Sequence, residues 1–113
     1  MLFRQGKHFS VFPFKVTWLP ENAAEHLQAG VGVSSRHFKR AVDRNRIKRL
    51  MRESYRLQKN ELQQYLTEKD KWLSVFLIYT GNEIPRYGTV FEILEIILLK
   101  LKKLSDENDT PAV

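Results

Sequence analysis

At 113 residues the chain is long enough to form one domain with a modest hydrophobic core, and too short for two. It contains no cysteine, which excludes disulfide bonds, thiolate metal sites and cysteine nucleophiles and suits a reducing cytoplasm. The net charge of +6 is concentrated in residues 36–59, which contain ten Lys or Arg and only two acidic residues. A positive excess carried by one segment is the pattern expected of a protein that binds a polyanion.

The N-terminal third of the chain is expected to form two strands. Residues 11–19 alternate in polarity, which predicts a half-buried strand. Its apolar face holds Phe12, Phe14, Val16 and Trp18, and its polar face holds Lys15 and Thr17. Pro13 indicates that this strand starts there or lies at a sheet edge. Residues 27–35 are the second strand, in which Gly30 and Gly32 indicate a bend or a close approach to the backbone.

From Ala41 onward the apolar period becomes helical, and we predict a helix that ends before residues 67–71. Its apolar stripe recurs at intervals of three and four residues and holds Ile47, Leu50, Met51, Ser54 and Tyr55, continued by Leu62 and Tyr65. The opposite face is polar or basic and holds Asn45, Lys48, Arg49, Arg52, Arg56 and Lys59, with Arg44 and Arg46 on its flanks. Asp43 in the first turn is favourable at the positive end of the helix dipole.

The C-terminal half is expected to add one strand and one helix. Residues 72–80 are apolar on both alternations, which is typical of a strand covered on both faces. Residues 81–88 are a loop, residues 89–104 an apolar helix with Thr89 as N-cap, and residues 105–113 an acidic, disordered tail. The predicted order is β-β-α-β-α, an α+β sheet with helices packed on it. The large side chains expected in the core are Phe12, Phe14, Val16, Trp18, Trp72, Phe76 and Phe91.

No arrangement of residues in the sequence predicts protein-based catalysis or a metal site. The three histidines, His8, His26 and His37, lack metal-ligand spacing, the carboxylates form no catalytic set, and no phosphate-binding glycine loop is present. No segment reaches the roughly 18 apolar residues of a membrane span. We therefore expect neither a membrane nor a small-molecule substrate as a partner.

The basic helix face has two interpretations. A charged helix face is most often only solvated, but this one lacks the acidic residues that pairing at i, i+4 would place there. Like charges at this density cost stability unless a polyanion neutralises them, which favours a nucleic-acid face. The predominance of arginine favours forked hydrogen bonds to phosphate and stacking on unpaired bases, and leaves DNA and RNA both open. Asn45, uncharged among arginines, indicates a directed hydrogen bond or a helix-start cap.

Residues 33–56, VSSRHFKRAVDRNRIKRLMRESYR, resemble the signature of the bacterial ribonuclease P protein subunit. In that signature a strand ending in Val-Ser leads through a basic loop into a helix that opens Ala-Val-x-Arg-Asn-Arg-Ile-Lys-Arg. The resemblance runs roughly from Leu2 to Leu104, because a hydrophobic strand and a C-terminal helix follow the basic helix. It implies a single domain of residues 1–104 whose N-terminal helix is largely absent, since Met1 lies near where that helix ends.

The fold that the resemblance implies is an α+β sandwich of the ribosomal protein S5 domain 2-like type, built on a central mixed sheet. Its β-α-β crossover, which contains the basic helix, is left-handed, an exception to the usual right-handed rule. The resemblance further implies that a catalytic RNA, with Mg²⁺, removes the 5′ leader of precursor tRNA, and that the chain is the protein subunit of this endoribonuclease. No residue of the protein is then catalytic.

The site residues follow from the resemblance by position. The helix and the loop before it bind the catalytic RNA, through Arg36, Lys39, Arg40, Arg44, Asn45, Arg46, Lys48, Arg49, Arg52 and Arg56. A cleft between the sheet face and this helix holds the single-stranded leader, with Phe3, Lys15, Thr17, Ser34 and Ser35 as candidate contacts. Two alternatives remain: a general RNA- or DNA-binding module of ribosomal or nucleoid type, and a protein-only nuclease, which needs clustered carboxylates.

Overall fold

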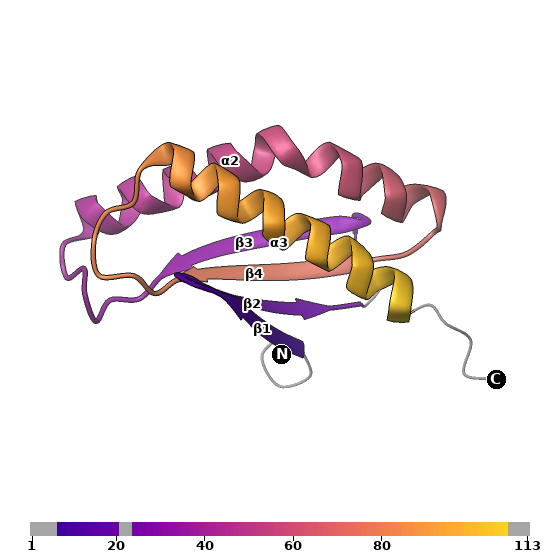
Figure 1. Ribbon diagram of the computed structural model, residues 1–113, viewed down its shortest axis with the longest axis horizontal. Coiled ribbons are helices and arrows are strands. Elements are labelled where there is room, and N and C mark those ends of the chain that lie inside the picture. The colour runs from indigo at the N-terminus through magenta and orange to yellow at the C-terminus, as the bar shows by residue number, and fades with distance from the viewer. Residues whose placement is uncertain (1–6, 21–23, 109–113) are drawn as a thin grey trace.

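The computed structural model describes residues 7–20 and 24–108, which form one four-stranded mixed sheet with two helices on one of its faces (Figure 1). Along the chain the elements are β1 (Lys7–Val11), β2 (Phe14–Leu19), β3 (Leu27–Val33), α2 (Ala41–Glu68), β4 (Leu73–Tyr79) and α3 (Tyr87–Asn108). The strand order is β1-β2-β4-β3, and only β3 and β4 pair in parallel. The α+β class and the mixed sheet are as predicted, and α2 forms the β-α-β crossover between the two parallel strands.

An N-terminal hairpin replaces the single strand predicted for residues 11–19. β1 and β2 pair antiparallel, and the chain turns between them at Phe12 and Pro13, which are joined by a cis peptide bond. Pro13 has no N–H to donate to a ladder, and its carbonyl oxygen accepts hydrogen bonds from the backbone N–H and the Oγ1 of Thr80. Phe12 at the turn is 84% exposed. The prediction missed β1, which is short and mostly polar, and wrongly assigned Phe12 to the core.

The hydrophobic core lies between the sheet and the two helices. Its largest contributions come from the inward-facing side chains of two strands and both helices: Phe14, Val16 and Trp18 of β2; Leu73, Val75, Leu77 and Tyr79 of β4; Ile47, Met51, Leu62 and Leu66 of α2; and Val90, Leu94, Ile97 and Leu101 of α3. The buried residues of α2 follow the predicted apolar stripe, with Leu50, Tyr55 and Tyr65 half-buried at its borders. Trp72 and Phe91, which were expected in the core, are only half-buried.

Only one face of β4 is fully buried, because both helices cover the same side of the sheet (Figure 1). The other face carries half-buried side chains, so the prediction of a strand buried on both sides was wrong. Phe76, expected in the core, lies on this second face, and its ring lies against the backbone of β3. A Cβ atom on Gly30 would stand 2.9 Å from Cδ1 of Phe76, and one on Gly32 would stand 3.1 Å from its Cζ. These glycines therefore permit the close approach to the backbone that the sequence indicated.

α3 is longer than predicted at both ends. It begins two residues before Thr89, which is therefore not its N-cap, and it continues to Asn108. Lys71, in the segment between α2 and β4, donates a hydrogen bond from Nζ to the carbonyl oxygen of Ser105 (2.7 Å), and Ser105 itself is buried. This contact holds the last turns of α3 in the fold, so the tail predicted from residue 105 does not begin there. Residues 109–113 lie outside the described part of the chain.

Ile47 is fully buried where α2 packs on the sheet. Ile47→Ala is therefore expected to lower the free energy of unfolding by about 2–5 kcal/mol, through lost contacts and a residual cavity. The matched control is Val42→Ala on the same helix, where the side chain is 60% exposed and the expected change is within about 0.5 kcal/mol. Urea unfolding followed by far-UV circular dichroism measures both, and equal effects of the two substitutions would contradict this packing.

Candidate nucleic-acid interface

The outward face of α2 carries most of the positive excess of the chain. Because Ile47, Met51 and Ser54 point into the core, the residues between them point away from it. This basic face consists of the exposed residues Asn45, Arg46, Arg49, Arg52 and Arg56 and the half-buried Lys48 and Lys59. Asn45 lies within the helix, whose N-cap is Arg40, so the helix-start cap considered for Asn45 is excluded.

Few carboxylates offset the basic face. Glu53 accepts a hydrogen bond from Arg56, and this contact, with the attraction of the carboxylate charge, raises the pKa of the Arg56 guanidinium. Asp43 lies 4.0 Å from Arg40 at the start of the helix. Within the described part of the chain, no ion pair involves four other cations of the face, Arg46, Lys48, Arg49 and Arg52. Four neighbouring cations on one rigid helix without carboxylate partners form an attractive surface for phosphate groups.

Arg44 differs from these arginines, because its side chain also holds the preceding loop. Its Nη1 donates hydrogen bonds to the carbonyl oxygens of Phe38 (2.7 Å) and Lys39 (2.8 Å). The carbonyl oxygen of Arg40 accepts hydrogen bonds from the backbone N–H groups of Asp43 and Arg44. The Arg44 side chain thus joins the basic loop to the first turn of α2. The sequence pattern did not distinguish this arginine from those of the basic face.

The loop of residues 34–40 is anchored near both of its ends. The backbone N–H of Ser34 donates to the carbonyl oxygen of Tyr79 (3.1 Å), and Ser34 Oγ accepts a hydrogen bond from the backbone N–H of Arg36 (3.3 Å). Phe38 is buried, with its ring centroid 6.2 Å from that of Tyr79. The exposed side chains of the loop include the predicted contacts Arg36, Lys39 and Arg40. The loop therefore adds three cations near the N-terminal end of the basic face.

The face of the sheet that points away from the helices carries Lys15 and Thr17, as predicted. Strand pairing aligns two rows of residues across all four strands, and we call these eight residues the outer sheet face: His8, Thr17, Phe76 and Gly30 in one row, and Ser10, Lys15, Ile78 and Gly32 in the next. Thr17 is buried, and its Oγ1 lies 3.0 Å from Nδ1 of His8. Lys15 is exposed.

The basic face and the outer sheet face lie on opposite sides of the sheet. α2 packs over one side of the sheet (Figure 1), the side that carries Val16 and Trp18, and by strand alternation Lys15 and Thr17 point the other way. The prediction of a cleft between this helix and the sheet face that carries Lys15 was therefore wrong. The alternation along β2 requires this result, because neighbouring residues of a strand point to opposite faces.

Ser34 and Ser35 lie at the junction of the two surfaces. They follow the end of β3, which contributes to the outer sheet face, and they begin the loop that leads into α2. Ser34 is half-buried and Ser35 is exposed. The third part of the predicted leader cleft, Phe3, lies outside the described residues.

Sequence reasoning missed two members of the outer sheet face. Phe76 was assigned to the core because β4 is apolar on both alternations, and only its register opposite Thr17 shows which face it occupies. His8 was rejected as a metal ligand and interpreted as a surface or loop histidine, since β1 was not predicted. Alternation within residues 7–11 is the signal that could have placed His8 on this face, because Phe9 and Val11 pack against the core.

The described His, Asp and Glu residues are dispersed over the fold. Among them, no group of three or more His, Cys, Asp or Glu could hold a metal ion. His26 stacks on Trp72 with ring centroids 4.6 Å apart, and its Nε2 lies 3.4 Å from Oδ1 of Asp70. Burial, with a smaller effect of Glu25, raises the pKa of Tyr55 to about 12, so this hydroxyl keeps its proton at neutral pH. In the same part of the chain, no helix is both long and apolar enough to cross a membrane.

The fold, the basic face and the basic loop together define a small α+β protein that binds nucleic acid. The family model for Ribonuclease P matches residues 1–100, and this chain belongs to that family.

Individual relatives agree with this assignment. The chain is 34% identical over 102 residues to the ribonuclease P protein component of Porphyromonas gingivalis, an alignment that covers 88% of this chain and 74% of the relative. The fold is similar to that of the RNase P protein from Thermotoga maritima, with 26% identity, a TM-score of 0.70 and coverage of 88% of this chain and 86% of that one. The fold is also similar to that of the Staphylococcus aureus RNase P protein, with 22% identity, a TM-score of 0.69 and coverage of 90% of this chain and 85% of that one.

The role of Arg44 is testable on the protein alone. Arg44→Gln removes the two hydrogen bonds to the loop and is expected to lower the free energy of unfolding by about 1–2 kcal/mol. Arg46→Gln removes the same charge from the exposed basic face, and its expected effect lies within about 0.5 kcal/mol. Chemical unfolding gives both values, and amide hydrogen exchange in residues 36–44 is expected to rise only in Arg44→Gln. An unchanged stability of Arg44→Gln would mean that the loop holds without this side chain.

Proposed function

We propose that this chain is the protein component of a ribonuclease P, in which a catalytic RNA removes the 5′ leader of precursor tRNA. The observation that carries the proposal is the basic face, since it presents at least four cations in one fixed direction that have no carboxylate partner among the described residues. Membership in the ribonuclease P family identifies the polyanion as RNA. We further propose a cytoplasmic location, in keeping with the absence of cysteine from the chain.

The basic face and the loop would bind the RNA subunit. Arg46, Arg49 and Arg52 can each place two N–H donors on one phosphate, and Lys48 adds a point charge beside them. Arg36, Lys39 and Arg40 extend the surface beyond the N-terminus of α2, where the amide groups of the first turn also favour an anion. Arg44 would act by keeping this loop in place rather than by touching the RNA.

The outer sheet face would bind the single-stranded leader. Lys15 supplies a cation for a phosphate, and in the row across the middle of the sheet His8 supplies a hydrogen-bonding group and Phe76 an aromatic ring. The predicted contact Thr17 is buried and would act by holding His8 through its hydroxyl. Ser34 and Ser35 would contact the leader near the point where it meets the RNA subunit. Because the two surfaces lie on opposite sides of the sheet, one protein can hold the RNA subunit and the leader simultaneously.

The protein would support cleavage without supplying a nucleophile or a base. Mg²⁺ held by the RNA would supply charge stabilisation in the cleavage step. The cations of this chain would lower the repulsion between the phosphate backbones of the RNA subunit and of precursor tRNA, so that less Mg²⁺ is needed to bring them together.

Reconstitution with the RNase P RNA of the same organism tests this proposal. At low millimolar Mg²⁺, addition of the full chain is expected to increase cleavage of precursor tRNA at the 5′ end of the mature sequence, measured by gel electrophoresis of labelled substrate. Arg46→Gln combined with Arg49→Gln should reduce the gain, whereas Lys69→Gln, an exposed charge beyond the end of α2, should leave it unchanged.

Two results of the reconstitution would contradict the proposal. RNA binding without any gain in cleavage would favour a general RNA-binding module. Cleavage by the protein without the RNA would mean that the chain itself is the nuclease.

The salt dependence of RNA binding distinguishes residues that contact phosphate from residues that only hold the loop in place. Arg49→Gln is expected to weaken the affinity for the RNA subunit and to flatten the slope of log K against log salt by about 0.7–0.9, the value for one lost phosphate contact. Arg44→Gln removes an equal charge and is expected to weaken binding without changing the slope. Fluorescence anisotropy between low and moderate salt gives both slopes. A flattened slope in Arg44→Gln would show that this residue contacts phosphate after all.

A further inference from the structure

The outer surface of α3 carries two apolar side chains that the fold of one chain does not cover. Ile96 is 53% exposed and Leu99 is 55% exposed, whereas Leu94, Ile97 and Leu101 of the same helix are buried against the sheet. The two exposed residues are three positions apart, so they lie side by side on the helix surface. Single exposed apolar residues are common, but an adjacent pair on a helix that already packs its other face is a candidate contact surface.

Opposite charges flank this pair at equal distances. Glu92 stands four residues before Ile96, and Lys103 stands four residues after Leu99; both side chains are exposed. Among the side chains of residues 7–20 and 24–106, neither of the two charged groups takes part in an ion pair. The spacing of four, three and four residues is that of the seam of a coiled coil, which keeps all four side chains on one stripe of the helix. We call these four residues the outer stripe.

Along the outer stripe the side chains run acidic, apolar, apolar, basic. This order is complementary to the same order on a second helix that runs in the opposite direction. If a second α3 lies antiparallel across it, with the two-fold axis between positions 97 and 98, Ile96 of one copy meets Leu99 of the other. The same operation places Glu92 opposite Lys103 at both ends of the contact. A parallel arrangement would instead place like charges together. We propose that the outer stripe is an interface with a second copy of this chain, in a two-fold symmetric, antiparallel dimer of α3 helices.

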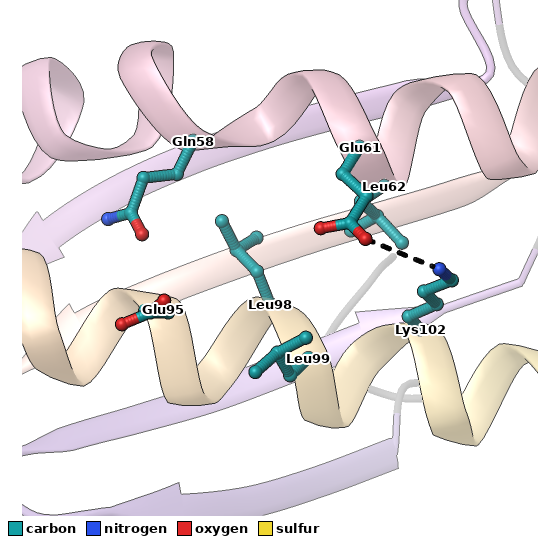
Figure 2. A pocket seen from close by; sticks show the side chains of 7 residues that line it. All are labelled: Gln58, Glu61, Leu62, Glu95, Leu98, Leu99 and Lys102. Carbon is teal, nitrogen blue, oxygen red and sulfur yellow. Dashed lines mark ion pairs between the residues drawn. The ribbon is translucent and has the colours of Figure 1, made fainter.

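A groove beside the stripe offers room for a side chain of the second copy (Figure 2). It lies between α2 and α3, has a volume of ≈ 230 Å³, and is lined by Gln58, Glu61 and Leu62 of α2 and by Glu95, Leu98, Leu99 and Lys102 of α3. Its polar rim is already ordered, because Gln58 Nε2 donates to the carbonyl oxygen of Phe91 (2.9 Å) and Lys102 Nζ lies 3.6 Å from Glu61 Oε1. Leu99 belongs both to the stripe and to the groove wall, so an apolar side chain packed against it would also enter the groove.

The contact would be small and the dimer therefore weak. One pair of crossed helices buries less surface than the roughly 800 Å² per partner of a typical stable complex. Two chains of net charge +6 also repel each other, which the ion pairs at the ends of the stripe offset only in part. We expect a monomer–dimer equilibrium that depends on protein concentration. The interface is separate from the basic face and does not rest on the proposed function.

Sedimentation velocity of the full chain without RNA, over a wide concentration range, tests the proposal. The wild-type chain is expected to dimerise, and Ile96→Asp to raise the dissociation constant by at least about tenfold. Glu92→Lys and Lys103→Glu are each expected to weaken the dimer by about tenfold, because each creates two like-charge contacts. The double variant exchanges the two charges and is expected to recover most of the wild-type affinity. Glu83→Lys, an exposed charge reversal outside α3, is the matched control. Its dissociation constant should differ from that of the wild type only by the effect of the changed net charge.

Comparison of the double variant with the two single charge reversals, Glu92→Lys and Lys103→Glu, makes the outcome decisive. All substituted positions are exposed, so far-UV circular dichroism and thermal unfolding are expected to match the wild type. A chain that stays monomeric at every concentration overturns the proposal, as does a double variant no better than either single one. Dimers that persist in Ile96→Asp would belong to another surface and would also overturn it. Loss of RNA affinity in Ile96→Asp, with self-association unchanged, would assign the stripe to the RNA instead.

Discussion

The burial of the apolar stripe of α2 is the contact on which the arrangement of the functional surfaces depends. Ile47, Met51, Leu62 and Leu66 are almost completely removed from water between the helix and the sheet. A side chain of this size contributes about 1.5–3 kcal/mol when buried, whereas a pair of like charges on a helix surface costs only a few tenths of a kcal/mol. The core therefore determines how the helix is rotated, and the density of arginines does not disturb it. Because the rotation is fixed, the basic face points in one direction before any RNA is bound.

The same sheet separates two surfaces that would handle different parts of an RNA complex. Its helix side supports the basic face, and its other side carries the row through Thr17 and Phe76. The loop of residues 34–40 connects them, and it is held by the burial of Phe38 and by the hydrogen bonds of Arg44. A loop of cations fixed in this way loses little conformational freedom on binding, so more of the contact energy is available for affinity.

Much of the fold could be predicted from the sequence, and the misses have physical causes. The helical period of residues 47–55 gave the correct buried and exposed sides of α2, because a long amphipathic helix has only one way to bury its stripe. β1 was missed because it is short and mostly polar, so its alternation extends over only residues 7–11. Phe76 was placed in the core because β4 is apolar at every position except Ser74, and polarity then gives little information on which face lies under the helices. The predicted end of α3 was too early because the contact between Lys71 and Ser105 joins residues distant in the sequence.

The sequence by itself determined the class of partner and the residues of the basic face. The charge imbalance, the helical spacing and the motif around Arg44, Asn45 and Arg46 are local properties, and local properties can be read without knowing the fold. The tertiary structure decided which arginines face outward and which one holds the loop. It also showed that Lys15 and the basic face lie on opposite sides of the sheet. These distinctions depend on hydrogen bonds and strand pairings between distant segments, since a guanidinium has the same charge whether it meets a phosphate or a carbonyl oxygen of its own chain.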